Sequence, residues 1–152
     1  MSTATLPTGD LYLVVGYDGS APASRALDAA VSLLQGRTGR IDVVYVAHIP
    51  DMGMVSAAAL AEIEINFDEV EQELRAEAGE RLRGRDQGWG FVRRQGMIAD
   101  ELIAVAKDIR DAHVSGSVAI VAGSSSHAMH RVVGSVAVSL ARHSPVPLVI
   151  VP

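Results

Sequence analysis

The residues best placed to do chemistry lie in a run of small and polar residues at positions 123–136. An apolar segment, 118–122, precedes this run, and an amphipathic segment, 135–143, ends it. We interpret the first as a buried strand and the second as a helix, because their apolar residues have the spacing typical of each. A helix start offers unpaired N–H groups and the positive end of the helix dipole. The run therefore predicts a phosphate site between Gly123 and the helix start at Gly134 and Ser135.

An ordinary strand-to-helix connection is the alternative interpretation of this run, since glycines also permit tight turns. Within it, His127 and His130 are three residues apart, a spacing that could place both on one side of a helix. No third metal ligand is nearby and the chain has no cysteine, so we predict no metal site and no catalytic thiol.

Strand-like and helical segments alternate along the chain. Predicted strands cover 11–16, 41–47, 91–95, 118–122 and 146–151, and predicted helices cover 22–34, 67–82, 98–109 and 135–143. Ser20 is the expected N-cap of the first helix. Gly84, Gly88 and Gly90 are expected to close the second helix, whose acidic residues between Glu62 and Glu80 indicate a solvated outer face.

This alternation predicts an α/β fold, an open five-stranded and mainly parallel sheet with helices on both faces, of the Rossmann-like kind. In such sheets ligands bind beyond the carboxyl ends of the strands, where the strand order reverses. Four loops should meet there. They follow the first four predicted strands and carry Asp18, Val46, Gly96 and Gly123.

Length and composition fit one compact domain over residues 10–152, with residues 1–9 as a flexible leader. Of the 152 residues, 49% are hydrophobic and 20% are charged, which supplies a substantial core. The formal net charge of -5 argues against nucleic acid as a partner. No apolar run approaches the length that spans a bilayer, so we expect a soluble cytoplasmic protein.

Several of these segments, in this order, resemble the universal stress protein family. The segments are the opening run from Val14 to Ser20, the strand that ends at Val46, the turn at Gly96, the strand with Gly123, and Gly134 to Val136. The resemblance covers essentially everything from Leu11 onward. It implies the fold of the adenine nucleotide alpha hydrolases and an adenine-nucleotide-binding regulatory or sensor module acting in the stress response.

The resemblance also implies the ligand and its contacts. The ligand would be ATP or another adenine nucleotide, with Mg²⁺ held through its phosphates. Asp18 would lie beside the nucleoside, the backbone of Val46 would meet adenine, Gly123 would approach the ribose, and Gly134 with Ser135 would hold phosphate. The implied binding residues are Gly16, Tyr17, Asp18, Val46, Gly96, Gly123, Ser124, Ser126, His127, Gly134, Ser135 and Val136.

The phosphate loop departs from the family pattern, which has a second glycine followed by nine residues and then Gly-Ser or Gly-Thr. Here Ser126 stands in place of that glycine, and positions 127–133 supply only seven residues before Gly134. Binding of a mono- or diphosphate, or of no nucleotide, is therefore an open alternative. In that alternative the chain acts as a dimeric interaction protein, pairing through its last strand from Val146 to Val151, as family members do.

An enzyme is the third class, and the sequence offers little for it. The chain has no Gly-Lys-Ser or Gly-Lys-Thr ending of a phosphate loop, and the third strand ends in Gln95-Gly96, where a phosphoacceptor receiver needs an aspartate. We expect slow ATP hydrolysis at most, and we assign no catalytic residue.

Overall fold

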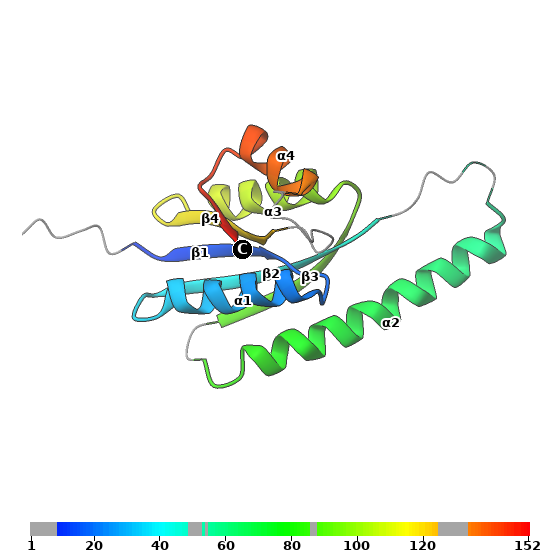
Figure 1. Ribbon diagram of the computed structural model, residues 1–152, viewed down its shortest axis with the longest axis horizontal. Helices are drawn as coiled ribbons and strands as arrows, with labels where there is room; N and C mark the ends of the chain where they lie inside the picture. Colours follow the sequence, from blue (N-terminus) through cyan, green and yellow to red (C-terminus); the bar gives the residue numbers. More distant parts are fainter. Residues whose placement is uncertain (1–8, 49–52, 54, 86–87, 125–133) are drawn as a thin grey trace, which may run out of the picture.

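The computed structural model describes residues 9–48, 53, 55–85, 88–124 and 134–152 (Figure 1). In chain order its elements are β1 (Leu11–Gly16), α1 (Ala21–Leu34), β2 (Gly39–Ala47), α2 (Ala57–Arg81), β3 (Gly88–Gln95), α3 (Ile98–Ala112), β4 (Ser117–Gly123), α4 (Ser135–His143) and β5 (Leu148–Val151). The five strands form one sheet in the order β3-β2-β1-β4-β5, and all its pairs are parallel. The predicted fold class is confirmed.

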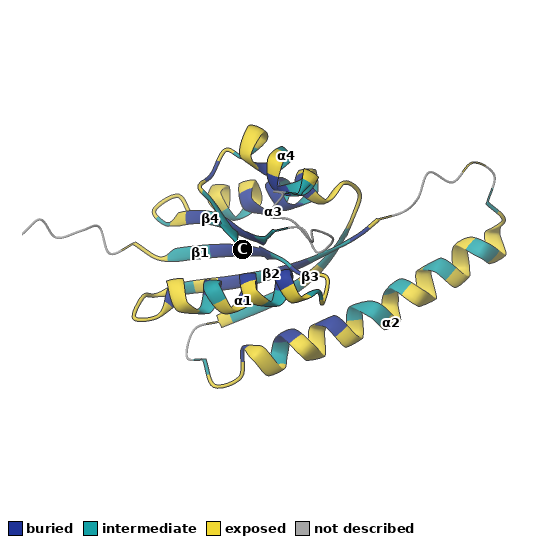
Figure 2. Ribbon diagram, viewed as in Figure 1, coloured by how far each residue is buried: buried dark blue, intermediate teal, exposed yellow. Residues whose placement is uncertain are grey.

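Helices cover both faces of the sheet, α1 and α2 on one and α3 and α4 on the other (Figure 1). Successive strand residues point to opposite faces. Leu13 and Val15 of β1 therefore pack into the core under α1 and α2, whereas Val14 packs into the core under α3 and α4. The central strands β1, β2 and β4 supply most of the fully buried strand residues (Figure 2).

The strand order reverses between β1 and β4. The chain builds the sheet outward from β1 through β2 to β3 and then returns to place β4 on the other side of β1. The loops that leave β1 and β4 consequently turn in opposite directions over the sheet, which opens a crevice at their carboxyl ends.

The helix α1 begins as predicted. The Ser20 Oγ accepts a hydrogen bond from the N–H of Ala23 at 3.3 Å, and Pro22 occupies the first turn. Such a cap satisfies one of the unpaired N–H groups of the first turn. It fixes the direction in which the chain leaves β1.

The helix α2 begins ten positions earlier than the predicted range 67–82. Ser56 caps it by accepting from the N–H of Ala59 at 3.2 Å, and the helix runs from Ala57. Only Leu74 and Ala78 in it are fully buried, and its first turns extend beyond the sheet (Figures 1 and 2). The first turns carry apolar residues on more than one side, Leu60 and Ile65 among them, so the pattern that predicted the helix was clear only from Phe67 onward.

Several strand boundaries also differ from the prediction: β2 begins two residues earlier, at Gly39, and β4 is one residue longer at each end. Gly88 and Gly90 belong to β3, where they pair with Arg40 and Asp42, instead of closing α2. The guanidinium of Arg40 lies over Gly90, where a Cβ would collide with Nη2, so this glycine makes room for the arginine. At the other edge, β5 begins at Leu148, two residues later than predicted, although the Pro147 carbonyl already accepts from the N–H of Ile120.

The predicted leader, residues 1–9, lies outside the described residues except for Gly9. Among the described residues, no helix combines the length and apolar character needed to cross a membrane.

Candidate functional site

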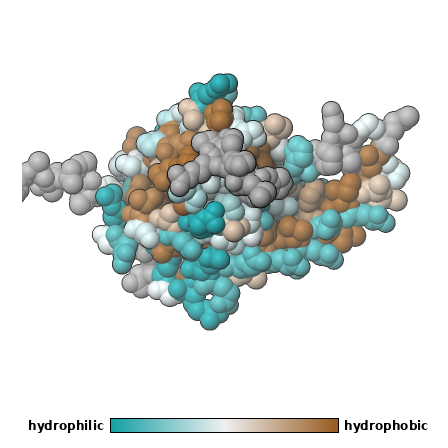
Figure 3. Space-filling view, in the orientation of Figure 1, coloured by the Kyte–Doolittle hydropathy of each residue, from teal (hydrophilic) through white to brown (hydrophobic). Residues whose placement is uncertain are grey.

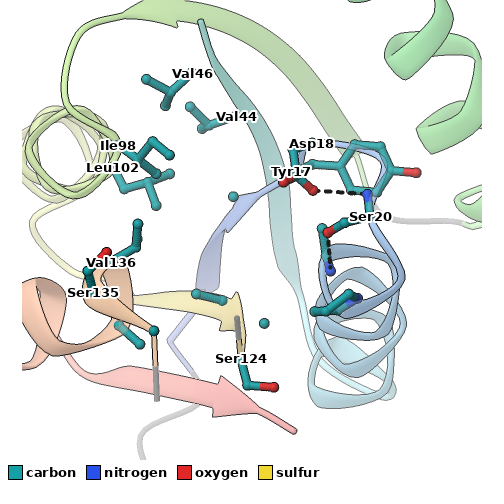
Figure 4. A pocket seen from close by; sticks show the side chains of 17 residues that line it. Tyr17, Asp18, Ser20, Val44, Val46, Ile98, Leu102, Ser124, Ser135 and Val136 are labelled. Carbon is teal, nitrogen blue, oxygen red and sulfur yellow. Dashed lines mark hydrogen bonds between the residues drawn. The ribbon is translucent and has the colours of Figure 1, made fainter. Parts of the chain in front are cut away.

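A cavity of about 230 Å³ opens where the carboxyl ends of β1 and β4 meet the starts of α1, α3 and α4 (Figure 4). It lies at the reversal of strand order, where the sequence placed a ligand site. Its lining residues are Gly16, Tyr17, Asp18, Ser20, Pro22, Ala23, Val44, Val46, Ile98, Leu102, Ala122, Gly123, Ser124, Gly134, Ser135, Val136 and Ala137.

Most of the residues expected to bind ligand line this cavity. They are Gly16, Tyr17, Asp18, Val46, Gly123, Ser124, Gly134, Ser135 and Val136. Gly96 is not among the lining residues. It follows β3 and donates its N–H to the carbonyl of Ala47 at 3.3 Å. Ser126 and His127 lie outside the described residues.

Val44, Ile98 and Leu102 also line the cavity, on its apolar side, and were not among the residues expected to bind ligand. Ile98 and Leu102 project from the first turns of α3 toward Val46 and Val44 of β2, and Val136 of α4 lies below them (Figure 4). Together these side chains make an apolar wall. Their signal in the sequence was the i, i+4 spacing of Ile98 and Leu102 directly after the third strand, which places both on one face of the helix.

Asp18 is the only charged residue in the described lining. Its Oδ1 accepts a hydrogen bond from the N–H of Ser20 at 2.9 Å, which fixes the carboxylate at the edge of the cavity (Figure 4). This is the local turn that an Asp two residues before its donor commonly makes. A carboxylate only accepts hydrogen bonds, so Asp18 suits a ligand with hydroxyl donors.

Tyr17 contributes backbone to the cavity, and its ring points away from it (Figure 4). The side chain is 3% exposed, and its hydroxyl donates to Glu77 Oε2 on α2 at 3.1 Å. Burial, and then the Glu77 carboxylate, raise the pKa of Tyr17 above its ordinary value. The ring therefore anchors the loop to α2.

Gly123 lies directly against the first turn of α1. A Cβ at this position would come within 2.5 Å of the carbonyl carbon and oxygen of Pro22. A backbone contact of this kind cannot yield without moving α1. The absence of a side chain at Gly123 thus lets α1 and β4 approach each other and sets the shape of the cavity between them.

The start of α4 closes the cavity opposite Asp18. Gly134 is the N-cap, with φ -65° and ψ 162°, no side chain caps the helix, and its first turn holds no acidic residue. A helix start of this kind offers first-turn N–H groups and the positive end of the helix dipole to an anion. Ser135 and, across the cavity at the end of β4, Ser124 add hydroxyl groups (Figure 4).

Sequence comparison identifies one family. The model of the Universal stress protein family matches residues 13–152. No curated protein matches the chain.

Solved structures share the fold. Universal stress protein UspA from Lactobacillus plantarum has a TM-score of 0.72 at 19% identity, over 93% of this chain and 97% of that one. A universal stress protein in complex with cAMP has a TM-score of 0.63 at 20% identity, over 93% of this chain and 97% of that one. A universal stress protein family protein from Arabidopsis thaliana with AMP bound has a TM-score of 0.63 at 12% identity, over 93% of this chain and 90% of that one.

Proposed function

This chain belongs to the universal stress protein family, and on that premise we propose that it binds an adenine nucleotide in the cavity between β1, β4 and the start of α4. In this proposal it is a cytoplasmic regulatory or sensor module of the stress response. Two similar folds carry adenine nucleotides, one cAMP and one AMP.

The observation that carries the proposal is that one cavity holds an apolar wall, a carboxylate and a helix start, each in a different part of its lining. An apolar wall of Val46, Ile98 and Leu102 suits the flat face of a base, because burial of apolar surface favours binding. Asp18 can accept hydrogen bonds from ribose hydroxyls. The open start of α4, at Gly134 and Ser135, suits a phosphate. A nucleotide has these three parts joined in this order.

The charge of the described lining favours a ligand with few phosphates. The described lining holds no Lys, Arg or His. The nearby candidates for positive charge in the sequence, His127, His130 and Arg131, lie outside the described residues.

These features support binding more than catalysis. In the described lining, Asp18 is the only acid and no cation is present to stabilise a transferring phosphoryl group. In the described part of the chain, no three His, Asp or Glu side chains come together as a metal site. We propose that Mg²⁺, where present, is held through the phosphates of the nucleotide.

Isothermal titration with adenosine, AMP, cAMP, ADP and ATP, with GMP as the base control, tests the proposal. We expect AMP or cAMP to bind and GMP to bind more weakly. We also expect freshly purified protein to release an adenine nucleotide on denaturation, which mass spectrometry would identify. No heat, no thermal shift and no released nucleotide, from protein with a cooperative unfolding transition, would overturn it.

The second candidate function is a dimeric interaction protein that has lost nucleotide binding. The edge strand β5 favours it, because Leu148, Val149, Ile150 and Val151 are all apolar and half-buried. The other edge strand, β3, carries Arg93 and Arg94 instead. Charged side chains protect an edge from pairing, whereas an uncharged apolar edge invites it.

Light scattering of the wild type beside Ile150→Lys tests this candidate. The Pro147 and Val151 carbonyls face β4, so by the alternation of a strand the backbone of Ile150 faces outward. Its side chain packs partly against the core under α3 and α4, so circular dichroism must show that the variant keeps its fold. We expect a wild-type dimer and a monomeric variant. A monomeric wild type at micromolar concentration would contradict pairing through β5. Binding of a nucleotide would contradict the second part of this candidate, the loss of nucleotide binding.

A further inference from the structure

The first part of α2 leaves the sheet with an apolar face uncovered. Ala59, Ile63, Phe67 and Leu74 recur along one side of the helix, but only Leu74 is fully buried. Leu60, beside this stripe, is 48% exposed. The helix projects past the ends of β2 and β3, and hydrophobic residues form a band along it (Figures 1 and 3).

One flank of this stripe is tied to the sheet by ion pairs. Arg93 of β3 reaches Asp68 at 2.6 Å, Glu71 at 3.4 Å and Glu64 at 3.6 Å. Gln95 donates a further hydrogen bond to Glu64 at 3.2 Å. These four contacts explain how a helix with so few buried residues stays beside the edge strand.

The other flank carries acids that the fold leaves unneutralised. Glu62, Glu69 and Glu73 are spaced seven and four apart, which puts them on one side of the helix, next to the stripe. All three are exposed, and within the described part of the chain none forms an ion pair. The surface is therefore an apolar stripe with a free acidic border.

The charge of α2 decides what can cover this surface. The helix carries eight carboxylates and two arginines, and both arginines lie after Leu74. A second copy would bring acidic flank against acidic flank, and a nucleic acid or an anionic membrane would be repelled in the same way. A protein segment with its own apolar stripe and with Lys or Arg beside it would satisfy both features.

We propose that the first part of α2, residues 57–73, docks a basic amphipathic helix of a partner protein. Leu60 and Ile63 are the apolar anchors of this surface, and Glu62, Glu69 and Glu73 select for positive charge. The surface lies outside the nucleotide cavity, so the inference stands or falls independently of the proposed function.

Fluorescence anisotropy with three synthetic peptides tests the inference on the full chain. The probe is a labelled peptide of Leu and Lys with leucines at i, i+3, i+4 and i+7. A shuffled peptide of the same composition and an analogue with Glu for Lys are the controls. We expect saturable binding of the probe that weakens with salt, and weak or no binding of both controls.

Matched variants locate the contact. Leu60→Gln with Ile63→Gln should weaken the probe at least about tenfold, or about 1.4 kcal/mol. Glu62→Gln, Glu69→Gln and Glu73→Gln combined should weaken it and flatten the salt dependence. Ile65→Gln is the control, because Ile65 is 58% exposed but lies on the opposite side of the helix.

Three outcomes would overturn the inference. Equal binding of the shuffled peptide would mean that charge alone attracts the probe. An equal loss with Ile65→Gln would mean that the stripe is not the contact. Self-association of the wild type that Leu60→Gln abolishes would mean that a second copy covers the surface. Circular dichroism of each variant checks that the helix content is retained.

Discussion

At the scale of single residues, substitutions of Gly134 can change ligand binding without changing the fold. Its φ of -65° is accessible to any residue, and it occupies an N-cap position, where Asp and Asn are both favoured over most residues. We expect Gly134→Asp and Gly134→Asn to fold. Only the Asp variant places a negative charge where the proposed phosphate binds, so it should lose at least about tenfold in AMP affinity by calorimetry.

Adenosine is the ligand control for this pair. It lacks a phosphate, so its affinity should be similar for the Asp and Asn variants. Equal AMP affinity in the two variants would contradict binding of the phosphate at the start of α4.

Gly123 gives a second prediction at this scale. The Cβ of Gly123→Ala would strike the Pro22 backbone at 2.5 Å, so α1 must shift. Overpacking of this kind costs about 1–3 kcal/mol, and urea unfolding should show it. Gly79→Ala is the control. Its Cβ would meet Trp89 at an ordinary 3.6 Å, and replacing a helical glycine should stabilise by roughly 0.5–1 kcal/mol. An unchanged unfolding midpoint for Gly123→Ala would contradict the close approach.

Gly123 also shows what a sequence hides. Its type and its place after an apolar run indicated the site, but the contact that requires a glycine is with Pro22, 101 positions earlier in the sequence. Ile98 and Leu102 marked the predicted helix over 98–109, but nothing in the sequence assigned them to the site. A spacing of four residues places two side chains on one face, but only the packed fold determines that this face borders a cavity.

At the scale of elements, Arg93 ties the first part of α2 to the sheet by ion pairs, whereas Leu74 and Ala78 pack its second part into the core. Arg93→Met keeps much of the volume of Arg93 and removes its pairs with Glu64, Asp68 and Glu71. We expect amide hydrogen exchange to speed up in α2, with local opening easier by about 1 kcal/mol. High salt should narrow the difference between wild type and variant, since it screens the pairs in the wild type.

Arg94→Met is the matched control, because Arg94 pairs with Glu101 and Asp108 of α3. It should affect exchange in α3 and leave α2 unchanged. Equal exchange of α2 in wild type and Arg93→Met would show that apolar contacts alone hold this helix.

The boundaries of elements were predicted where the elements are buried and missed where they are exposed. All five strands were found, and the central ones nearly to the residue, because both faces of the central strands are covered and their apolar runs are continuous. The start of α2 and the glycines of β3 were missed. The first turns of α2 extend beyond the sheet, and Gly90 leaves space for Arg40 instead of ending an element.

At the scale of the whole molecule, the fold should be sensitive to alkaline pH. The pKa of each of the three tyrosines is raised above 10.0, in each case first by burial, with Asp10 adding to it for Tyr12, Glu77 for Tyr17 and Asp18 for Tyr45. The unfolded chain therefore loses these protons at lower pH than the folded one. Stability is full below about pH 10 and falls as the pH rises through the folded pKa values.

Phenolate absorbance checks this prediction. In the native protein the three tyrosines should titrate above their positions in the urea-unfolded protein, and the urea midpoint should fall on the alkaline side of pH 10. Coincident titration curves in the two states would contradict it.

The fold class could be predicted from the sequence, but the order of the strands in the sheet could not. Alternating strands and helices imply a parallel sheet and a ligand edge, which is why Asp18, Gly123 and Gly134 were expected to meet, and they do. The order β3-β2-β1-β4-β5 could not be derived from periodicity, because any strand that is apolar on both faces fits any central position. That order separates Gly96, at the end of an edge strand, from the lining of the cavity.

The loop that carries Asp18 rests on α2 at a single place. Gly19, at φ 78°, lies so close to Leu74 that a Cβ would come within 2.8 Å of Leu74 Cδ2, and one helical turn further on Glu77 accepts from Tyr17. From Leu74, α2 extends seventeen residues back to Ala57, or about 25 Å at roughly 1.5 Å per residue, and Arg93 of β3 holds this stretch at Glu64, Asp68 and Glu71. Where salt screens these pairs, a tilt of about 10° at Leu74 would displace Ala57 by about 4 Å over this length. A small shift of the Asp18 loop would then become a displacement of about one side-chain width at the start of α2.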